Sequence, residues 1–181
     1  MLARIKYLTA GESHGKGLLG IIDNVPAGLE ISEDYIAHQL SRRQMGHGRG
    51  GRMKIEKDRA EIYTGVRHGK SLGSPIGLIL PNKDFENWTK KMSLEPVDND
   101  ITKVTLPRPG HADLAGVQKF DFDDIRNVLE RSSARETAMR VALASVCRKL
   151  LREIGIEVGS RVIQIHTAKD ETPIADNLSP E

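Results

Sequence analysis

The sequence predicts an α+β domain in which short strands of its first half pack around one long, buried helix. Residues 5–9 and 18–25 are apolar stretches of strand length on either side of a glycine-containing turn. Residues 74–80 form a third such stretch, which begins at a proline. Residues 138–151 are apolar on most sides at helical spacing, which is typical of a helix inside a domain. With 181 residues and no repeat or linker-like stretch, the chain is predicted to form a single domain over residues 1–181.

The long helix is expected to begin at Ser133, because Ser133 and Glu136 have the spacing of a capping box. It is expected to end near Glu153, where Gly155 supplies the left-handed residue that often follows a helix. A helix of that length spans roughly 30 Å, enough to cross a small domain. The pattern predicts burial along the whole helix, with only a thin polar stripe at Arg140, Ser145 and Arg148.

The start of this helix is a candidate anion site. Unpaired backbone N–H groups and the positive end of the helix dipole favour a bound anion. Arg131, Ser132, Ser133 and Arg135 add hydroxyl and guanidinium groups at the same place. The alternative is that the serines only cap the helix and the arginines only face solvent, and this stretch alone favours neither interpretation.

Composition indicates a globular protein of a reducing compartment. The single cysteine, Cys147, allows no internal disulfide and is expected to be a small core residue. No apolar run reaches membrane-spanning length, and residues 1–6 lack the apolar core of a signal peptide, so we expect a cytoplasmic protein. Net charge is only +2, but residues 42–70 carry nine Lys and Arg against three acids, which predicts an anionic ligand.

A glycine- and arginine-rich loop follows a first predicted helix that ends near Gln44. Residues 46–51 have the glycine spacing of a dinucleotide-binding turn, but such a turn follows a strand and opens a helix, whereas here a helix precedes it. We interpret the segment as a solvated loop that presents Arg43, Arg49 and Arg52 to a carboxylate or phosphate. The alternative is a basic loop without a ligand.

The turn between the first two strands contains Gly11, Ser13 and Gly15 at the spacing of a nucleophile elbow, which raises a serine hydrolase as one hypothesis. An elbow needs a strand followed by a helix, but here a strand follows. Ser13 and His14 are also neighbours that point apart in an extended segment, so they are not expected to pair as nucleophile and base. Both arguments exclude the hydrolase hypothesis.

Shorter elements are predicted along the rest of the chain. Ser32 is expected to cap the first helix. Residues 55–57 and 60–66 have the pattern of a hairpin, and residues 156–158 and 161–165 that of two short strands. A separate long surface loop, residues 81–106, holds the single tryptophan and is predicted to act as a lid over a site.

A second histidine segment follows this loop. Two prolines and Gly110 restrict the backbone around Arg108 and His111, and rigid placement suits a catalytic histidine. A lone histidine is as often structural, so the residue pattern alone leaves both roles open for His111. His14, His111 and Asp113 lack the spacing of helical or cysteine-containing metal sites, so no metal site is predicted.

Four motifs together resemble the chorismate synthase family. In chain order they are Gly11-Glu12-Ser13-His14-Gly15, Arg49-Gly50-Gly51-Arg52, Arg108-Pro109-Gly110-His111-Ala112-Asp113 and Arg131-Ser132-Ser133-Ala134-Arg135-Glu136-Thr137. Four motifs in the family's order make a specific match. It covers residue 5 to about residue 165, the N-terminal half of the family's chain, without the C-terminal motifs that add further flavin contacts. The resemblance therefore implies that the chain is incomplete at its C-terminus.

The resemblance implies a β-α-β sandwich, of which this chain is the N-terminal half, and assembly as a homotetramer. It implies an FMN-dependent lyase that completes the shikimate pathway by 1,4-anti elimination of phosphate from 5-enolpyruvylshikimate 3-phosphate, giving chorismate. Reduced FMN is required without net oxidation, and either NADPH or an external reductase supplies the electrons. The C–H bond that breaks is too weakly acidic for a side-chain base, so the protein contributes position, proton management and charge stabilisation.

The resemblance also assigns roles to individual residues. His14 matches the histidine that protonates the leaving phosphate, and His111 matches the one that serves protonation of the reduced flavin, roles that need a group titrating near neutral pH. The positions that match FMN contacts are Arg131, Ser132 and Ser133. The positions that match contacts to the substrate or, in some assignments, to NADP are Ser13, Arg43, Arg49, Arg52, Arg108 and Arg135.

Two rival hypotheses come from other classes of protein. The glycine- and arginine-rich loop resembles RNA-binding segments, but Tyr63 is the one aromatic residue near it, and base stacking is a main source of single-strand affinity. Nucleic acid is therefore a disfavoured partner. The other rival is a structural or regulatory fragment that binds no ligand.

Overall fold

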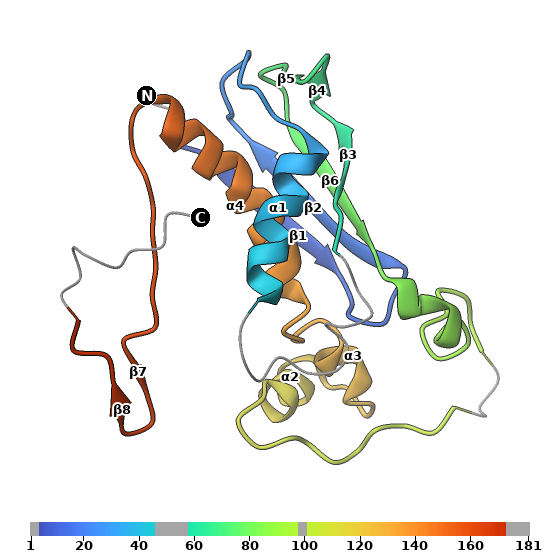
Figure 1. The fold of residues 1–181 in the computed structure, drawn as a ribbon. Helices are drawn as coiled ribbons and strands as arrows, with labels where there is room; N and C mark the ends of the chain where they lie inside the picture. Colours follow the sequence, from blue (N-terminus) through green and yellow to red (C-terminus); the bar gives the residue numbers. More distant parts are fainter. Residues whose placement is uncertain (1–3, 46–57, 98–100, 173–181) are drawn as a thin grey trace.

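A computed structural model describes residues 4–45, 58–97 and 101–172. Their central feature is an antiparallel sheet of four strands in the order β1-β2-β6-β3 (Figure 1). These strands span Lys6–Gly11 (β1), Gly17–Asp23 (β2), Ile76–Pro81 (β6) and Glu61–Thr64 (β3). Two small ladders pair Val66–Arg67 (β4) with Lys70–Ser71 (β5) and Gln164–Ile165 (β7) with Ala168–Lys169 (β8).

Two helices cover one face of the sheet (Figure 1). They are α1, which spans Glu33–Gln44, and α4, which spans Glu136–Glu153. Three shorter helical segments lie beyond one end of the sheet, namely the 3-10 helix η2 (Lys83–Asn87), α2 (Asp113–Phe120) and α3 (Arg126–Leu129). Within the described ranges no helix is long and apolar enough to cross a membrane. The predicted α+β class is confirmed.

Alternation along the strands decides which side chains reach the core. In β2, Leu18 and Ile22 point toward the helices and are 1% exposed, whereas Leu19 and Ile21 lie on the opposite face and are about half exposed. The same period of two in β6 buries Ile76, Leu78 and Leu80. The helices complete this core with Ile36, Leu40, Met139, Ala142, Leu143 and Val146.

The end of α4 follows the sequence prediction. The helix stops at Glu153, and Gly155 follows with φ of 76°. The N–H groups of Gly155 and Ile156 donate to the carbonyl oxygens of Arg152 and Leu151, which is the hydrogen-bond pattern of a Schellman motif.

The predicted capping box at the start of α4 is wrong. The Ser133 hydroxyl accepts a bond from the Arg135 N–H at 3.3 Å, and no side chain caps the helix. The reason is that the Glu136 carboxylate is used elsewhere. It pairs with the Arg131 guanidinium and accepts a 2.5 Å hydrogen bond from the Thr9 hydroxyl, so it ties α4 to β1.

Burial of α4 is also more limited than predicted. Buried positions end at Val146, and from Cys147 onward every helical residue is half-buried or exposed. Arg140 faces solvent as expected, but Ser145 is 2% exposed while Ala144 is exposed. Ser145 tolerates burial because its hydroxyl donates to the helix backbone three residues earlier, at 2.6 Å.

Predictions for the shorter elements had mixed outcomes. The Ser32 cap of α1 is confirmed, because its hydroxyl accepts from the Tyr35 N–H at 3.2 Å. The first strand of the predicted hairpin, residues 55–57, lies outside the described ranges. Its second strand, predicted at residues 60–66, contains β3, which pairs with β6. The strand predicted at 156–158 is wrong, and only Gln164–Ile165 of the other one pairs, because these apolar stretches have no neighbouring strand edge in the described part of the chain.

The predicted surface loop after β6 begins with ordered structure. η2 is followed by a turn in which the Trp88 N–H donates to the Phe85 carbonyl oxygen at 2.8 Å. The Trp88 indole N–H donates to Asp84 at 3.0 Å. Trp88 is therefore held in a definite position rather than carried on an irregular loop.

We predict that Gly20→Ala lowers the free energy of unfolding by about 1–3 kcal/mol, the usual range for overpacking a core. Gly20 lies where α4 crosses β2, and a Cβ there would meet Met139 Sδ at 2.5 Å and Leu143 Cδ1 at 2.9 Å. Gly77 in β6 is the matched control, because a Cβ there meets nothing closer than Thr64 at 3.6 Å. Urea unfolding of both variants is the measurement, and equal losses would contradict this account of the packing.

Candidate active site

The turn between β1 and β2 carries Ser13 and His14 and is fixed from two sides. On one side, the Asn82 side-chain amide donates to the carbonyl oxygens of Glu12 and Gly15, both at 2.9 Å. Asn82 directly follows β6, which pairs with β2, so the sheet itself brings the amide to the turn. On the other side, the Ser13 N–H donates to the Glu130 carbonyl oxygen at 3.0 Å.

The carboxylate of Glu130 contacts both Ser13 and His14 of this turn. Its Oε2 accepts from the Ser13 hydroxyl at 2.6 Å and from the His14 N–H at 3.1 Å, and it lies 2.7 Å from His14 Nδ1. Its other oxygen accepts from Arg126 at 3.1 Å. Glu130 is only 2% exposed, and burial alone would raise its pKa. The hydrogen bonds from Ser13 and His14 and the charge of Arg126 outweigh burial and hold the pKa of Glu130 below its ordinary value.

The sequence pattern predicted that the side chains of Ser13 and His14 point apart, and this prediction is wrong. The Ser13 hydroxyl lies 3.1 Å from His14 Nδ1. The two residues occupy a tight turn rather than an extended strand, and both side chains are drawn to one carboxylate oxygen. The hydroxyl donates to Glu130, so the histidine is not placed to activate it as a nucleophile.

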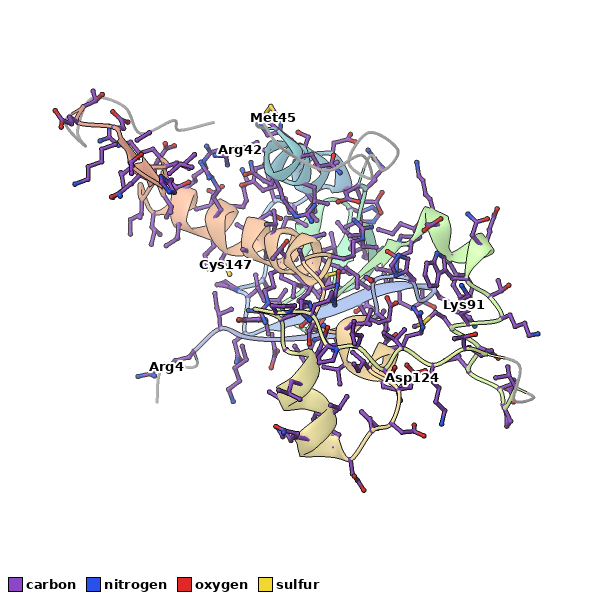
Figure 2. The ribbon with its side chains drawn as sticks, turned by 90° about the horizontal axis from the view of Figure 1, so that it is seen from below. Arg4, Arg42, Met45, Lys91, Asp124 and Cys147 are labelled. Atoms are coloured by element: carbon purple, nitrogen blue, oxygen red, sulfur yellow. The ribbon has the colours of Figure 1, made fainter. Side chains whose placement is uncertain are left out.

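Trp88 covers one face of the His14 ring. The ring centroids are 3.9 Å apart with an interplanar angle of 29°. The cationic groups of Lys91 and Arg126 lie over the indole at 5.1 and 5.3 Å from its centroid. Lys91 lies at the η2 end of the molecule in Figure 2, on the same side as Asp124 next to α3. The His14 side chain remains 22% exposed, so it is oriented but still reachable.

A second buried carboxylate, Asp58, holds two of the predicted anion-binding arginines. It accepts from Arg135 at 2.5 Å and from Arg43 at 3.3 Å. Arg135 also donates to the side-chain oxygen of Asn82 at 3.0 Å, which connects this pair to the turn of His14. Arg135 lines a cavity of about 1100 Å³ between α1 and β3, together with Arg59, Lys83 and the acids Glu33, Asp58 and Glu61. Neither His14 nor His111 lines it.

The predicted anion site at the start of α4 is smaller than expected. The N–H groups of Glu136, Thr137 and Ala138 already donate to carbonyl oxygens three residues earlier, so they are not unpaired. Arg131 donates to the carbonyl and hydroxyl oxygens of Thr9, both at 3.0 Å, and pairs with Glu136. The exposed Ser132 and the half-exposed Arg131 guanidinium remain as groups that can reach an anion.

The third buried carboxylate is Asp113, at the start of α2. One of its oxygens pairs with His111 Nδ1, and the other accepts from Arg108 Nε at 3.0 Å. The guanidinium of Arg108 lies 3.2 Å from the His111 ring nitrogens. The bond from Arg108 outweighs burial and holds the pKa of Asp113 well below its usual range. Asp113 is fully buried, whereas the His111 side chain is 24% exposed.

Six predicted site residues are thus held by three buried carboxylates that the prediction did not include. Arg49 and Arg52 lie outside the described ranges. The hydrogen bond from Arg108 to Asp113 raises the pKa of Arg108, and the negative charges of Asp113 and Glu130 add to this effect. The one local signal for Glu130 was its spacing of four residues from Arg126, which is typical of a helical ion pair.

We predict that Asp113→Asn flattens the loss of stability at acid pH. A carboxyl whose folded pKa is depressed contributes stability that is fully present above its unfolded pKa of about 4 and is lost as pH falls through the lower folded pKa. The difference in unfolding free energy between wild type and variant should therefore be largest at pH 7 and shrink toward pH 3. Asp121→Asn, at an exposed position, is the control, and a pH-independent difference for Asp113→Asn would contradict the prediction.

Comparison with known proteins places this geometry in one family. A family model described as chorismate synthase matches residues 5–179. Curated chorismate synthases from Chlorobium luteolum and Aquifex aeolicus are 57% identical over 167 residues and 58% identical over 165 residues. A solved structure described as a crystal structure of chorismate synthase matches with a TM-score of 0.73 and 44% identity.

These matches cover nearly all of this chain but less than half of each matched protein. The match to the Chlorobium luteolum relative covers 92% of this chain and 42% of the relative, and the match to the Aquifex aeolicus relative covers 91% and 42%. The match to the solved structure covers 94% of this chain and 41% of that chain. The chain thus spans about two fifths of the length of the relatives it matches, and it belongs to the chorismate synthase family.

Proposed function

We propose that this chain is the N-terminal part of a lyase that forms chorismate by 1,4-anti elimination of phosphate from 5-enolpyruvylshikimate 3-phosphate. The observation that carries the proposal is the pair of partly exposed histidines, His14 and His111, each held at Nδ1 by a buried carboxylate. A phosphate leaving group needs a proton donor, and a histidine presented in this way is suited to that role.

His14 is the proposed proton donor to the leaving phosphate. Its Nδ1 lies against Glu130 and one ring face is covered by Trp88, so the ring is held in one orientation, from which we propose that it donates a proton to the substrate. Arg126 and Lys91 lie close to the same indole and add positive charge beside an anionic substrate. Such preset charge lowers the cost of placing a phosphate there.

His111 is the proposed proton group on the flavin side. Asp113 fixes its Nδ1, and the neighbouring Arg108 lies along the same ring. The two proline residues that flank Arg108 and the helix start at Asp113 limit movement of this segment. A fixed donor close to a reaction centre loses little entropy when it acts.

The residues at the start of α4 fit the phosphate end of FMN. Ser132 presents an exposed hydroxyl, and Arg131 presents a guanidinium that Glu136 and Thr9 hold in place. These are donor groups of the kind that bind phosphate. Reduced FMN, when bound, supplies an electron toward expulsion of phosphate and takes up the hydrogen. We propose that Ser133 belongs to the same contact set.

We propose that the substrate's phosphate and carboxylates are bound by Arg43, Arg49, Arg52 and Arg135. Arg43 and Arg135 are positioned for this by Asp58, and Arg49 and Arg52 are assigned by family resemblance alone. Because Asp58 neutralises part of their charge, we expect Arg43 and Arg135 to position other groups as well as to bind an anion. Ser13 acts at the turn itself, where it connects Glu130 and His14.

We also propose that the complete protein assembles with further copies of itself, as the family resemblance implies a homotetramer. The support is an apolar open face of the sheet opposite α1 and α4. Its most exposed large apolar side chains are Leu8, Leu19, Ile21 and Tyr63. Exposed apolar surface of this kind marks contact regions.

The proposed function is tested by chorismate formation in a complete enzyme. This chain would replace the matching segment of the Aquifex aeolicus relative, to which it is 58% identical over 165 residues. Anaerobic assay with 5-enolpyruvylshikimate 3-phosphate and photoreduced FMN should give chorismate, and sedimentation would report the oligomeric state. The 181 residues alone should give none, because part of the pocket is missing and orientation accounts for ~7–11 kcal/mol of a barrier. No product from the complete enzyme would refute the proposal.

We predict that His14→Ala and His111→Ala each lower turnover of that complete enzyme on the order of a hundredfold or more, with KM within a few fold. General acid and base groups contribute about this much. His38→Ala is the control, because His38 is exposed on α1 away from both clusters. Wild-type turnover in either variant would remove that histidine from the mechanism.

A further inference from the structure

We propose that Glu136 and Thr9 are positioning residues for Arg131, and that their hold on its guanidinium gives the site at the start of α4 its preference for a flavin that carries a phosphate. The identity of the anion rests on the proposed function, but the contacts among the three residues do not. Thr9 lies in β1, Arg131 lies between α3 and α4, and Glu136 is the first residue of α4. Three separate elements thus meet at one guanidinium.

The hydrogen bonds among these residues form a closed ring. Arg131 Nη2 donates to the carbonyl oxygen and to the hydroxyl oxygen of Thr9, both at 3.0 Å. Arg131 Nη1 donates to Glu136 Oε2, and the Thr9 hydroxyl donates to Glu136 Oε1 at 2.5 Å. Each residue bonds to the other two, so the guanidinium cannot turn without breaking bonds to both β1 and α4.

The guanidinium held in this way still has donors for a ligand. A guanidinium has five N–H donors, and the bonds to Thr9 and Glu136 use three of them. In the described part of the chain, the Nε–H of Arg131 donates to no protein group. The Arg131 side chain is 38% exposed, and the next residue, Ser132, presents an exposed hydroxyl. Neighbouring donors of these two kinds suit a phosphate.

Glu136 has two opposite effects on an anion at this place. Burial alone would raise its pKa, but the hydrogen bonds from Arg131, Thr9 and Arg140 outweigh burial and hold the pKa of Glu136 below its ordinary value. The ionised carboxylate repels a phosphate, yet it also holds the guanidinium that attracts one. We expect the hold to matter more, because a charge-assisted hydrogen bond depends on geometry at contact distance, whereas water and salt weaken the field at an exposed site.

The first measurement is binding of FMN and of riboflavin, which lacks the phosphate, to the complete enzyme. Glu136→Ala should raise the Kd of FMN about tenfold, the effect of losing one charge-assisted contact, and leave that of riboflavin within about twofold. If Glu136 acted through its charge alone, its removal would tighten FMN binding. Unchanged or tighter FMN binding, or equal losses for FMN and riboflavin, would overturn the proposal. Glu153→Ala is the matched control, because Glu153 is exposed on the same helix and pairs with Lys149.

Thr9 offers a second pair of variants that leaves every charge in place. Thr9→Val removes the hydroxyl and keeps the shape, so it should weaken FMN binding by about fivefold and leave riboflavin binding unchanged. Thr9→Ser keeps the hydroxyl and should bind FMN like wild type. Valine suits a strand better than serine, so a purely structural effect would give the opposite order. Equal FMN affinity in the two variants would overturn the role of Thr9, and this pair decides the proposal if Glu136→Ala fails to fold.

The third measurement asks whether Glu136 acts through Arg131. Arg131→Ala should weaken FMN binding about tenfold, and adding Glu136→Ala should weaken it no further, because the guanidinium that Glu136 holds is already gone. A further loss in the double variant would overturn the proposal. All three measurements report binding, so they decide the roles of Glu136 and Thr9 even if the complete enzyme forms no chorismate. Chorismate formation with an FMN affinity that does not depend on Glu136 would refute this inference and leave the proposed function intact.

Discussion

The arrangement of the candidate site depends on the Glu130 carboxylate, which joins the two parts of the chain that carry its chemistry. The turn between β1 and β2 belongs to the sheet, and Glu130 directly follows α3, which lies beyond one end of the sheet. Both the side chain and the backbone of Glu130 bond to this turn. Since Asn82 also fixes the turn from the end of β6, His14 is held from two sides rather than carried on a mobile loop.

Buried carboxylates are expensive unless each oxygen is matched by donors, and here the donors are functional residues themselves. Glu130 binds His14, Asp113 binds His111, and Asp58 binds Arg43 and Arg135. The fold therefore satisfies its buried charges with the same side chains that the proposed reaction needs. One consequence is that removal of a carboxylate should affect folding and chemistry together, which is why experiments on them need a readout beyond stability.

Local chemistry made much of the fold predictable. The period of α4, the glycine after it and the Ser32 cap of α1 are properties of short stretches, and the structure has them where the sequence placed them. The capping box failed because Glu136 finds stronger partners in Arg131 and Thr9, which are distant or outside the helix. A local pattern cannot anticipate that competition.

The histidines, serines and arginines of the site could be predicted from the sequence, but its buried carboxylates could not. Motifs identified the histidines and arginines, but Asp58 and Glu130 meet their partners across 77 and 117 residues of sequence. No spacing rule reaches that far. The same limit explains Ser13 and His14, whose side chains meet at an oxygen of the distant residue Glu130. Trp88 was placed in a covering loop, but its stacking on His14 required the fold of η2.

The most direct test of this account is the coupling energy between Ser13 and Glu130, since their bond joins the β1–β2 turn to the segment after α3. Urea unfolding of Ser13→Ala, Glu130→Gln and the double variant would give it as a double-mutant cycle. Both residues are 2% exposed, so we expect the double variant to be more stable than the sum of single losses by about 1–3 kcal/mol. Additive losses within about 0.3 kcal/mol would contradict the claim that this contact holds the turn in place.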